Sequence, residues 1–272
     1  SVKRRTEKMI EFIMYCTQSD WTCPGTGDTF NNFSGDDYFV RGAKHFNRSD
    51  MLWMATRGRE GTPPLARSVA FKHGGYFIMR SDWGPDARYL QVMNGGARGH
   101  SHADSLQVMV SAFGRQLIID PGVYVYGTSE TGKLTRTSSH STIAVDGKDA
   151  HKSDDAPNYW ESNSRYDYFD GTNVGYHGLG DVRMRRRIVF LKPDCWVVLD
   201  DVTGSGNRKL DSRFVCCAGK VRIRGNSAIF TDGKAGLVVA TPPGEKSSLG
   251  VEEGKWAVHG KLVPVPVIRK SA

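Results

Sequence analysis

From Pro64 onward the chain is a succession of short apolar runs, and no helix of useful length separates them. Gly, Asp, Asn or Pro residues punctuate these runs. Short strands at this spacing, without helices between them, are typical of an antiparallel β-sandwich. The predicted strands are residues 68–80, 88–93, 105–113, 115–119, 142–145, 166–169, 183–191, 196–202 and 237–240.

The residues before Pro64 have a different pattern. Val2–Thr17 carries apolar residues at the three-and-four spacing of one helix face, and Arg41–Arg57 predicts a second helix. Cys23–Asp37 between them is rich in turn-forming residues, and GREGTPP (58–64) has the composition of a linker. We therefore expect a mainly β protein with two parts, a helical segment at residues 1–60 and an antiparallel β-sandwich at residues 65–272. Because the chain opens at Ser1 inside a predicted helix and has no signal peptide, we expect a piece of a longer or processed protein.

The charge balance favours an anionic partner. With 37 Lys and Arg against 29 Asp and Glu, the formal net charge is +8. The sequence has no helix-turn-helix, RNP or zinc-finger pattern, which weakens the case for nucleic acid. It has no basic amphipathic helix, and no run approaches the roughly 20 apolar residues of a membrane span. An acidic polysaccharide remains by elimination.

The basic and cysteine-containing segments are interpreted as structural. In a strand, Arg183, Arg185 and Arg187 share one face and Arg186 points to the other, which favours a solvated or cleft-edge face without a ligand. Asp200-Asp201 ends an apolar run and is most simply a turn. Among five cysteines, Cys16 and Cys23 are the only pair for which we consider a disulfide, and we expect most of them to be buried free thiols.

Four of the eight histidines fall between positions 100 and 151. GHSHAD places His100 and His102 two residues apart, on one side of the sheet if the segment is extended. Asp120 ends the run RQLIID, and His140 precedes another apolar run. Two imidazoles and a carboxylate are suitable zinc ligands. However, an Asp before Pro-Gly is commonly a turn former, and an isolated His is commonly a core or surface residue. Spacing alone leaves both interpretations open.

An ordered set of motifs carries a family resemblance. GHSHAD is followed by DPGVYVYG and then by R-x-x-x-H before a VDG turn. This run, residues 80–147, resembles the C-terminal sandwich of the heparinase II/III-like polysaccharide lyases and their alginate-lyase relatives, and a weaker resemblance extends to residue 214. The first 60 residues resemble the last helices of the α/α toroid that precedes the sandwich in that family. The resemblance implies a supersandwich fold.

The resemblance also implies roles for individual residues. His102, Asp120 and His140 would hold a structural zinc ion, and His100 would be the cleft histidine, which neutralises the substrate carboxylate or assists proton transfer. Tyr124 or Tyr126 would take part in proton transfer, although aromatic packing or sugar stacking is an equally good interpretation for each. The implied substrate-binding residues are Asn94, Arg98 and Arg136.

The implied reaction is β-elimination beside a uronic acid of an acidic, glycosaminoglycan- or alginate-like polysaccharide. The principal catalytic Tyr and the toroid Asn or His lie upstream in the family, so we expect this chain by itself to be catalytically incomplete. The resemblance implies a periplasmic or secreted bacterial protein and leaves homodimer formation open. Two alternatives remain: a zinc-stabilised carbohydrate-binding or scaffold module without turnover, and a zinc hydrolase in which the three ligands activate water.

Overall fold

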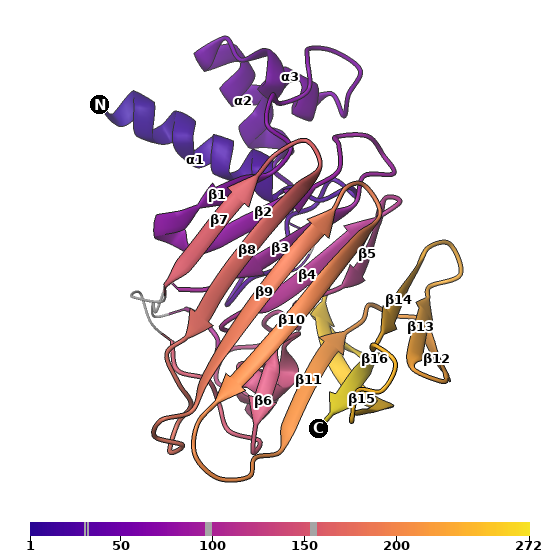
Figure 1. The fold of residues 1–272 in the computed structure, drawn as a ribbon. Coiled ribbons are helices and arrows are strands. Elements are labelled where there is room, and N and C mark those ends of the chain that lie inside the picture. Colours follow the sequence, from indigo (N-terminus) through magenta and orange to yellow (C-terminus); the bar gives the residue numbers. More distant parts are fainter. Residues whose placement is uncertain (30, 32, 96–99, 153–156) are drawn as a thin grey trace.

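The computed structural model describes residues 1–29, 31, 33–95, 100–152 and 157–272. Three helices gather at the end of the molecule that carries the N-terminus: α1 (Val2–Cys16), α2 (Asp36–Phe46) and α3 (Ser49–Ala55) (Figure 1). The remainder is built from antiparallel sheets, which confirms the predicted β-sandwich fold. Within the described ranges, none of the helices is both long enough and apolar enough to cross a membrane.

Among the described residues the strands form four antiparallel sheets. Neighbouring strands within each sheet are hydrogen-bonded in the following order. The first is β1 (Val69–Phe71), β2 (Tyr76–Arg80), β3 (Tyr89–Met93), β4 (Gln107–Ala112) and β5 (Arg115–Ile118). The second is β10 (Cys195–Thr203), β9 (Arg183–Leu191), β8 (Tyr166–Asn173) and β7 (Asn158–Ser162). The third is β15 (Ser248–Val258), β16 (Lys261–Ser271), β11 (Leu210–Val215) and β6 (Ile143–Val145). The fourth is β12 (Lys220–Arg224), β13 (Ser227–Thr231) and β14 (Gly236–Ala240). Three short helical elements complete the fold: η1 (Lys72–Gly74), α4 (Ser129–Leu134) and η2 (Thr137–Ser139).

The β1–β5 sheet is covered on both faces. On one face Phe77 lies in the main core, with its ring centroid 4.7 Å from that of Phe169 in β8. In Figure 1 the β7–β10 sheet lies in front of this face. On the other face Ile78 and Tyr89 pack in a second core with Met14 of α1. Because successive side chains of a strand point to opposite faces, β2 needs consecutive apolar residues, and Phe77, Ile78 and Met79 supply them.

A buried arginine fastens the helical segment to this sheet. The Nη2 of Arg80 donates to the carbonyls of Tyr15 at 3.2 Å and Thr17 at 2.5 Å, both at the end of α1. Its guanidinium lies over the rings of Trp83 and Tyr89, 4.0 and 4.8 Å from their centroids. Burial lowers the pKa of Arg80 to about 10. The cation therefore relies on carbonyl dipoles and ring faces for its stabilisation.

The structure corrects several local predictions. The helix expected over residues 41–57 is two helices, because Asn47 adopts a left-handed conformation with φ 54° at the end of α2. The strand expected over residues 68–80 is interrupted by η1, where Gly75 has φ 71°. Strands β7, β11, β12, β13, β15 and β16 and helix α4 were not predicted.

The cysteines and the acidic pair also differ from expectation. Cys16 and Cys23 are buried free thiols with no disulfide between them, and Cys195 is exposed. Asp200-Asp201 is not a turn: both residues lie within β10, opposite Arg186 and Arg185 of β9. The predicted faces of β9 are confirmed, because Arg186 is fully buried while Arg183 and Arg185 are exposed.

Candidate functional site

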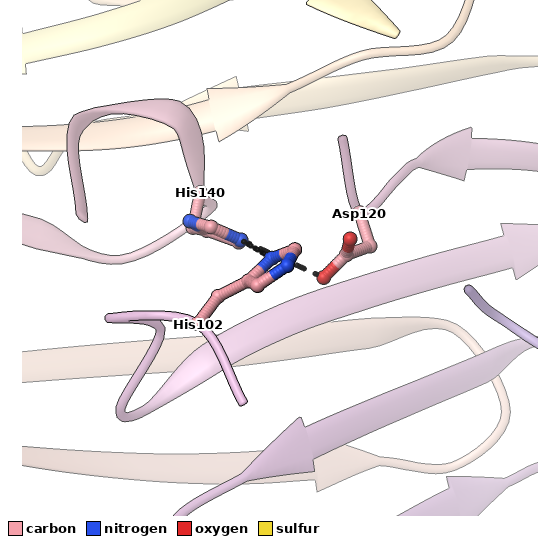
Figure 2. Close-up of side chains that lie close together, drawn as sticks. All are labelled: His102, Asp120 and His140. Atoms are coloured by element: carbon pink, nitrogen blue, oxygen red, sulfur yellow. Dashed lines mark hydrogen bonds and ion pairs between the residues drawn. The ribbon is translucent and has the colours of Figure 1, made fainter. Parts of the chain in front are cut away.

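Three separate segments bring the predicted metal ligands together (Figure 2). His102 lies in the loop before β4, Asp120 follows β5, and His140 directly follows η2, shortly before β6. Strands β4 and β5 are neighbours in one sheet, and the amide of Val108 in β4 donates to the carbonyl of Ser141 at 3.1 Å. The ligands thus come from loops at strand ends and not from within the strands.

The spacing of the three side chains suits a zinc ion. One ligand atom from each residue lies within 4.8 Å of the others, and all three residues are buried. The His102 Nδ1 atom is 3.2 Å from His140 Nε2, and that nitrogen is 3.8 Å from Asp120 Oδ2. Two nitrogens bound to one tetrahedral zinc at about 2.05 Å would be about 3.3 Å apart.

The hydrogen-bond partners of the two rings explain why a cation fits between them. His140 Nδ1 lies 2.8 Å from the carbonyl oxygen of Arg136, and His102 Nε2 lies 3.2 Å from Asp28 Oδ1. Both of these oxygens only accept, so each neutral ring directs its single N–H outward. The remaining lone pairs then face each other across 3.2 Å. Metal-binding histidines are commonly held in this orientation, with the N–H that faces away from the metal bonded to a carboxylate or a carbonyl.

Burial shifts the pKa values of His140 and Asp120 away from their usual values. It favours the neutral form of each side chain. Burial, followed by the proximity of His102, lowers the pKa of His140 to about 3, so its ring is neutral. Burial and then the neighbouring Asp104 raise the pKa of Asp120 well above its usual value. Asp120 forms no ion pair with Lys or Arg among the described residues. An uncompensated buried carboxylate is costly, and a bound cation would remove that cost.

Asp120 is placed for both of the roles that the sequence left open. Its Oδ1 accepts the backbone N–H of Gly122 at 2.7 Å, which is the bond of a turn former. Its Oδ2 accepts from Gln107 at 2.8 Å and faces the two histidines. The same Gln107 nitrogen donates to Asp104 at 2.9 Å. Burial raises the pKa of Asp104 to about 7.

A pocket of about 420 Å³ opens beside the buried cluster. This volume lies in the range of small-molecule sites. Polar and aromatic side chains converge on it from the turn-rich segment, β2, and the loops before β4 and after β5. The lining includes Thr26, Asp28, Tyr76, His100, Asp104 and Tyr126.

His100 and His102 diverge because their segment is a loop and not the extended strand that was considered. The side chain of His100 is 81% exposed and lines the pocket, whereas that of His102 is 1% exposed and faces the cluster. His100 Nδ1 lies 2.8 Å from Asp28 Oδ2. Desolvation and then the nearby carboxylate of Asp28 raise the pKa of Tyr126.

The remaining predicted catalytic and substrate-binding residues are placed less favourably. Tyr124 is half-buried and is not part of the pocket lining. Asn94 is buried, and its amide donates to Asn158 at 2.8 Å and to the carbonyl of Thr172 at 3.2 Å, so it joins β3 to the β7–β10 sheet. Arg136 is exposed beside Asp149, at 3.7 Å. Arg98 lies outside the described residues.

Sequence reasoning missed the pocket residues contributed by the N-terminal part of the chain. Asp28 lies in the turn-rich segment, and Tyr76 begins β2. Burial raises the pKa of Tyr76, although a hydrogen bond from Thr26 opposes the shift. A lone Asp between turn formers carries no signal of its own, because its partners are some seventy residues away.

Comparison with known proteins settles the family. The model of the family described as heparinase II/III-like, C-terminal, matches residues 63–269. The chain belongs to this family. The described geometry therefore belongs to a heparinase II/III-like C-terminal domain together with the helices that precede it.

Named relatives and solved structures agree with this assignment. The chain is 26% identical to a heparin-sulfate lyase of Pedobacter heparinus over 98% of its length, and 25% identical to a heparin-sulfate lyase of Bacteroides stercoris over 79%. The crystal structure of heparan sulfate lyase HepC from Pedobacter heparinus superposes with a TM-score of 0.89 at 22% identity over 98% of the chain. A heparinase III structure superposes with a TM-score of 0.86 at 18% identity, also over 98%.

This heparinase II/III-like chain spans less than half the length of each of these relatives. The chain spans 42% of the Pedobacter heparinus protein and 33% of the Bacteroides stercoris protein. It covers 44% and 45% of the two solved chains. Those structures include counterparts of the helices, because nearly all of this chain superposes on them.

Proposed function

We propose that this chain is the C-terminal part of a polysaccharide lyase that cleaves a uronic-acid-containing glycan by β-elimination. The observation that carries the proposal is the placement of His100 on the wall of a pocket beside Tyr126, with the candidate metal centre behind it. The relatives are named heparin-sulfate lyases, which supports a glycosaminoglycan of the heparin or heparan sulfate kind as the substrate class. From the family we infer that the enzyme acts in the periplasm or outside the cell.

In a β-elimination a base removes the C5 proton of the uronate, the C4–O4 bond breaks, and a C4=C5 double bond forms. An acid returns a proton to the departing O4. Asp28 accepts the N–H at Nδ1 of His100, which leaves the Nε2 lone pair of the exposed ring available to a proton in the pocket. The hydroxyl of Tyr126 is a proton donor in the same pocket. His and Tyr suit general acid–base roles of this kind.

We further propose that His102, Asp120 and His140 hold one zinc ion with a structural role. When bound, the ion would supply positive charge between the two ring nitrogens and the carboxylate, and its binding free energy would add to folding free energy. The ordered loops after β5 and before β4 would then depend on it. Chelation is expected to lower the melting temperature of the zinc-loaded chain.

The burial of this centre argues against the zinc-hydrolase alternative. A hydrolytic zinc keeps an open position for water next to the substrate. Here His102, Asp120 and His140 are 0–1% exposed, whereas His100 of the pocket is 81% exposed. The pocket, and not the buried cluster, is accessible to a glycan.

The test is an assay of the longest natural form of the protein on heparin, heparan sulfate, hyaluronan, chondroitin and alginate. The expected product is an unsaturated uronate, detected by its ultraviolet absorbance. His100→Ala should lower turnover by about 10²- to 10⁴-fold, the usual contribution of a general acid or base. His45→Ala, an exposed histidine of α2, is the matched control and should retain activity. Binding without cleavage would support a carbohydrate-binding module, and saturated products would support a hydrolase.

A further inference from the structure

The turn-rich segment closes on itself and reaches into the site. An isolated antiparallel bridge joins Cys23 to Phe33 at its base. Near its tip, the amide of Thr29 donates to the carbonyl of Thr26 at 3.2 Å, which forms a tight turn around Asp28. The segment is also anchored to the sandwich, because Asn31 donates to the carbonyl of Ala257 at 2.9 Å.

The backbone of this turn is fixed against the loop that carries the histidines. The amide of Asp28 donates to the carbonyl of His100 at 3.0 Å. Gly27 has φ 57°, and a Cβ added there would lie 2.4 Å from that same carbonyl oxygen. The close approach therefore requires glycine, and it places the next side chain between His100 and His102.

The carboxylate of Asp28 divides its two oxygens between the two histidines. Oδ2 is 2.8 Å from Nδ1 of His100, and Oδ1 is 3.2 Å from Nε2 of His102. The side chain of Asp28 is only 16% exposed. A carboxylate only accepts hydrogen bonds, so the two contacts select the N–H at Nδ1 for His100 and at Nε2 for His102.

We propose that Asp28 is a positioning residue that fixes the ring orientation and tautomer of both His100 and His102. One carboxylate thereby presents a ring nitrogen of His100 to the pocket and a ring nitrogen of His102 to the metal centre. The first part of this role, toward turnover, rests on the proposed lyase function. The second part, toward the metal centre, rests on the proposed zinc site, whereas the ring tautomers can be measured in this chain without metal. Removal of a carboxylate that hydrogen-bonds to a metal-binding histidine commonly weakens metal affinity by about 10- to 100-fold.

The substitution Asp28→Asn separates the two contacts. An amide oxygen can still accept from Nε2 of His102, but the amide nitrogen on the other side donates. The amide nitrogen of Asn would donate to an unprotonated Nδ1 of His100, and the proton of that ring would then be on Nε2. Asp28→Ala removes both contacts. Asp37→Ala, at an exposed carboxylate in the first turn of α2, is the matched control.

The deciding measurement is the tautomer of each histidine ring, read from side-chain ¹⁵N chemical shifts of the metal-free 272-residue chain. In the parent and in Asp37→Ala we expect the proton of His100 at Nδ1. In Asp28→Asn we expect it at Nε2, and in Asp28→Ala we expect a mixture. Unchanged tautomers of both histidines in the Asn and Ala variants would overturn the proposal.

Zinc affinity, measured by competition with a chelator, provides a second readout. Asp28→Ala should bind zinc about 10- to 100-fold more weakly than the parent, and Asp28→Asn should stay close to the parent. Equal affinity of the Ala variant and the parent would contradict the part of the role directed at the metal centre.

The effect on turnover is measured in the longest natural form of the protein. There Asp28→Asn should lower kcat about 10-fold or more with little change in KM, because the base would carry its proton on the wrong nitrogen. If the parent enzyme has no lyase activity, the proposed function fails, while the ring tautomers still decide the role of Asp28. If the parent is active and Asp28→Asn retains its kcat, the role in turnover is refuted.

Discussion

The guanidinium of Arg186 forms two parallel hydrogen bonds with the carboxylate of Asp200, at 2.7 Å and 2.9 Å, across strands β9 and β10. Its third nitrogen, Nη1, donates to the carbonyls of Leu106 at 2.7 Å and Ser141 at 3.1 Å. Leu106 follows His102 by four residues, and Ser141 follows His140 directly. One fully buried arginine therefore braces both loops that carry the candidate imidazole ligands.

Removal of Asp200 should destabilise the protein strongly. Asp200→Ala leaves the charge of Arg186 buried without its partner, which typically costs about 3–5 kcal/mol of unfolding free energy. The matched control is Asp201→Ala, because Asp201 is the next residue of β10 and pairs with Arg187 at 2.6 Å, where the two side chains are 49% and 31% exposed. An exposed pair contributes about 0–1 kcal/mol. Urea denaturation of both variants measures the difference, and equal losses would refute the bracing role.

Asn94 is expected to act on stability and not on substrate affinity. Asn94→Ala removes the donor for Asn158 and for the carbonyl of Thr172, and unpaired buried acceptors cost about 1–3 kcal/mol. The exposed Asn207→Ala should leave the melting temperature unchanged. A raised KM in the longest natural form, with the melting temperature of Asn94→Ala unaffected, would instead support the substrate-binding role predicted from the sequence.

Zinc binding should release protons from carboxyl groups and not from His140. Burial lowers the pKa of His140 to about 3, so this ring has no proton to lose at neutral pH. Burial beside Asp104 raises the pKa of Asp120, so that its carboxyl must lose a proton to bind the ion. Apparent zinc affinity should therefore rise as pH rises through that pKa. Calorimetry in buffers of different ionisation enthalpy counts the protons, and Asp120→Asn should release fewer than the parent.

The 272-residue chain by itself should bind acidic glycans weakly and show little lyase activity. Losing part of a set of residues that act as a unit removes most of the rate. Binding should persist because the net charge of +8 remains, and it should weaken as salt screens that charge. Affinity for heparin at increasing ionic strength, together with product release, tests this expectation. Robust formation of unsaturated product would show that the chain completes its own site.

The sequence predicted the sandwich well where strands are short, apolar and bounded by turn formers. Strand β9 was predicted with the bounds that the structure has. Strand β16 was missed because Pro264 and Pro266 argue against a strand interior. The pairing of β16 with β11 begins at Val267, which lies opposite Val215. Both prolines precede this paired stretch, so the pairing with β11 does not require N–H groups from them.

The three candidate metal ligands could be named from the sequence because the motifs that carry them are ordered along the chain, and the structure brings these side chains together. Asp28 and Arg186 were not, because their importance depends on contacts between segments distant in sequence. Residues 23–37 were predicted to be rich in turns, but Asp36 and Asp37 already belong to α2. No local pattern shows that the turn at Asp28 closes over a histidine. Likewise, the acidic pair in β10 resembles a strand end until its cross-strand arginines are known.

Metal analysis of the chain purified without added metal tests the account most directly, because the proposed zinc ion would account for the facing ring nitrogens of His102 and His140. We predict one zinc per chain in the parent and in His100→Ala, and loss of zinc with a lower melting temperature in His102→Ala. Absence of zinc from the parent, together with a His102→Ala variant that melts at the same temperature, would contradict the account.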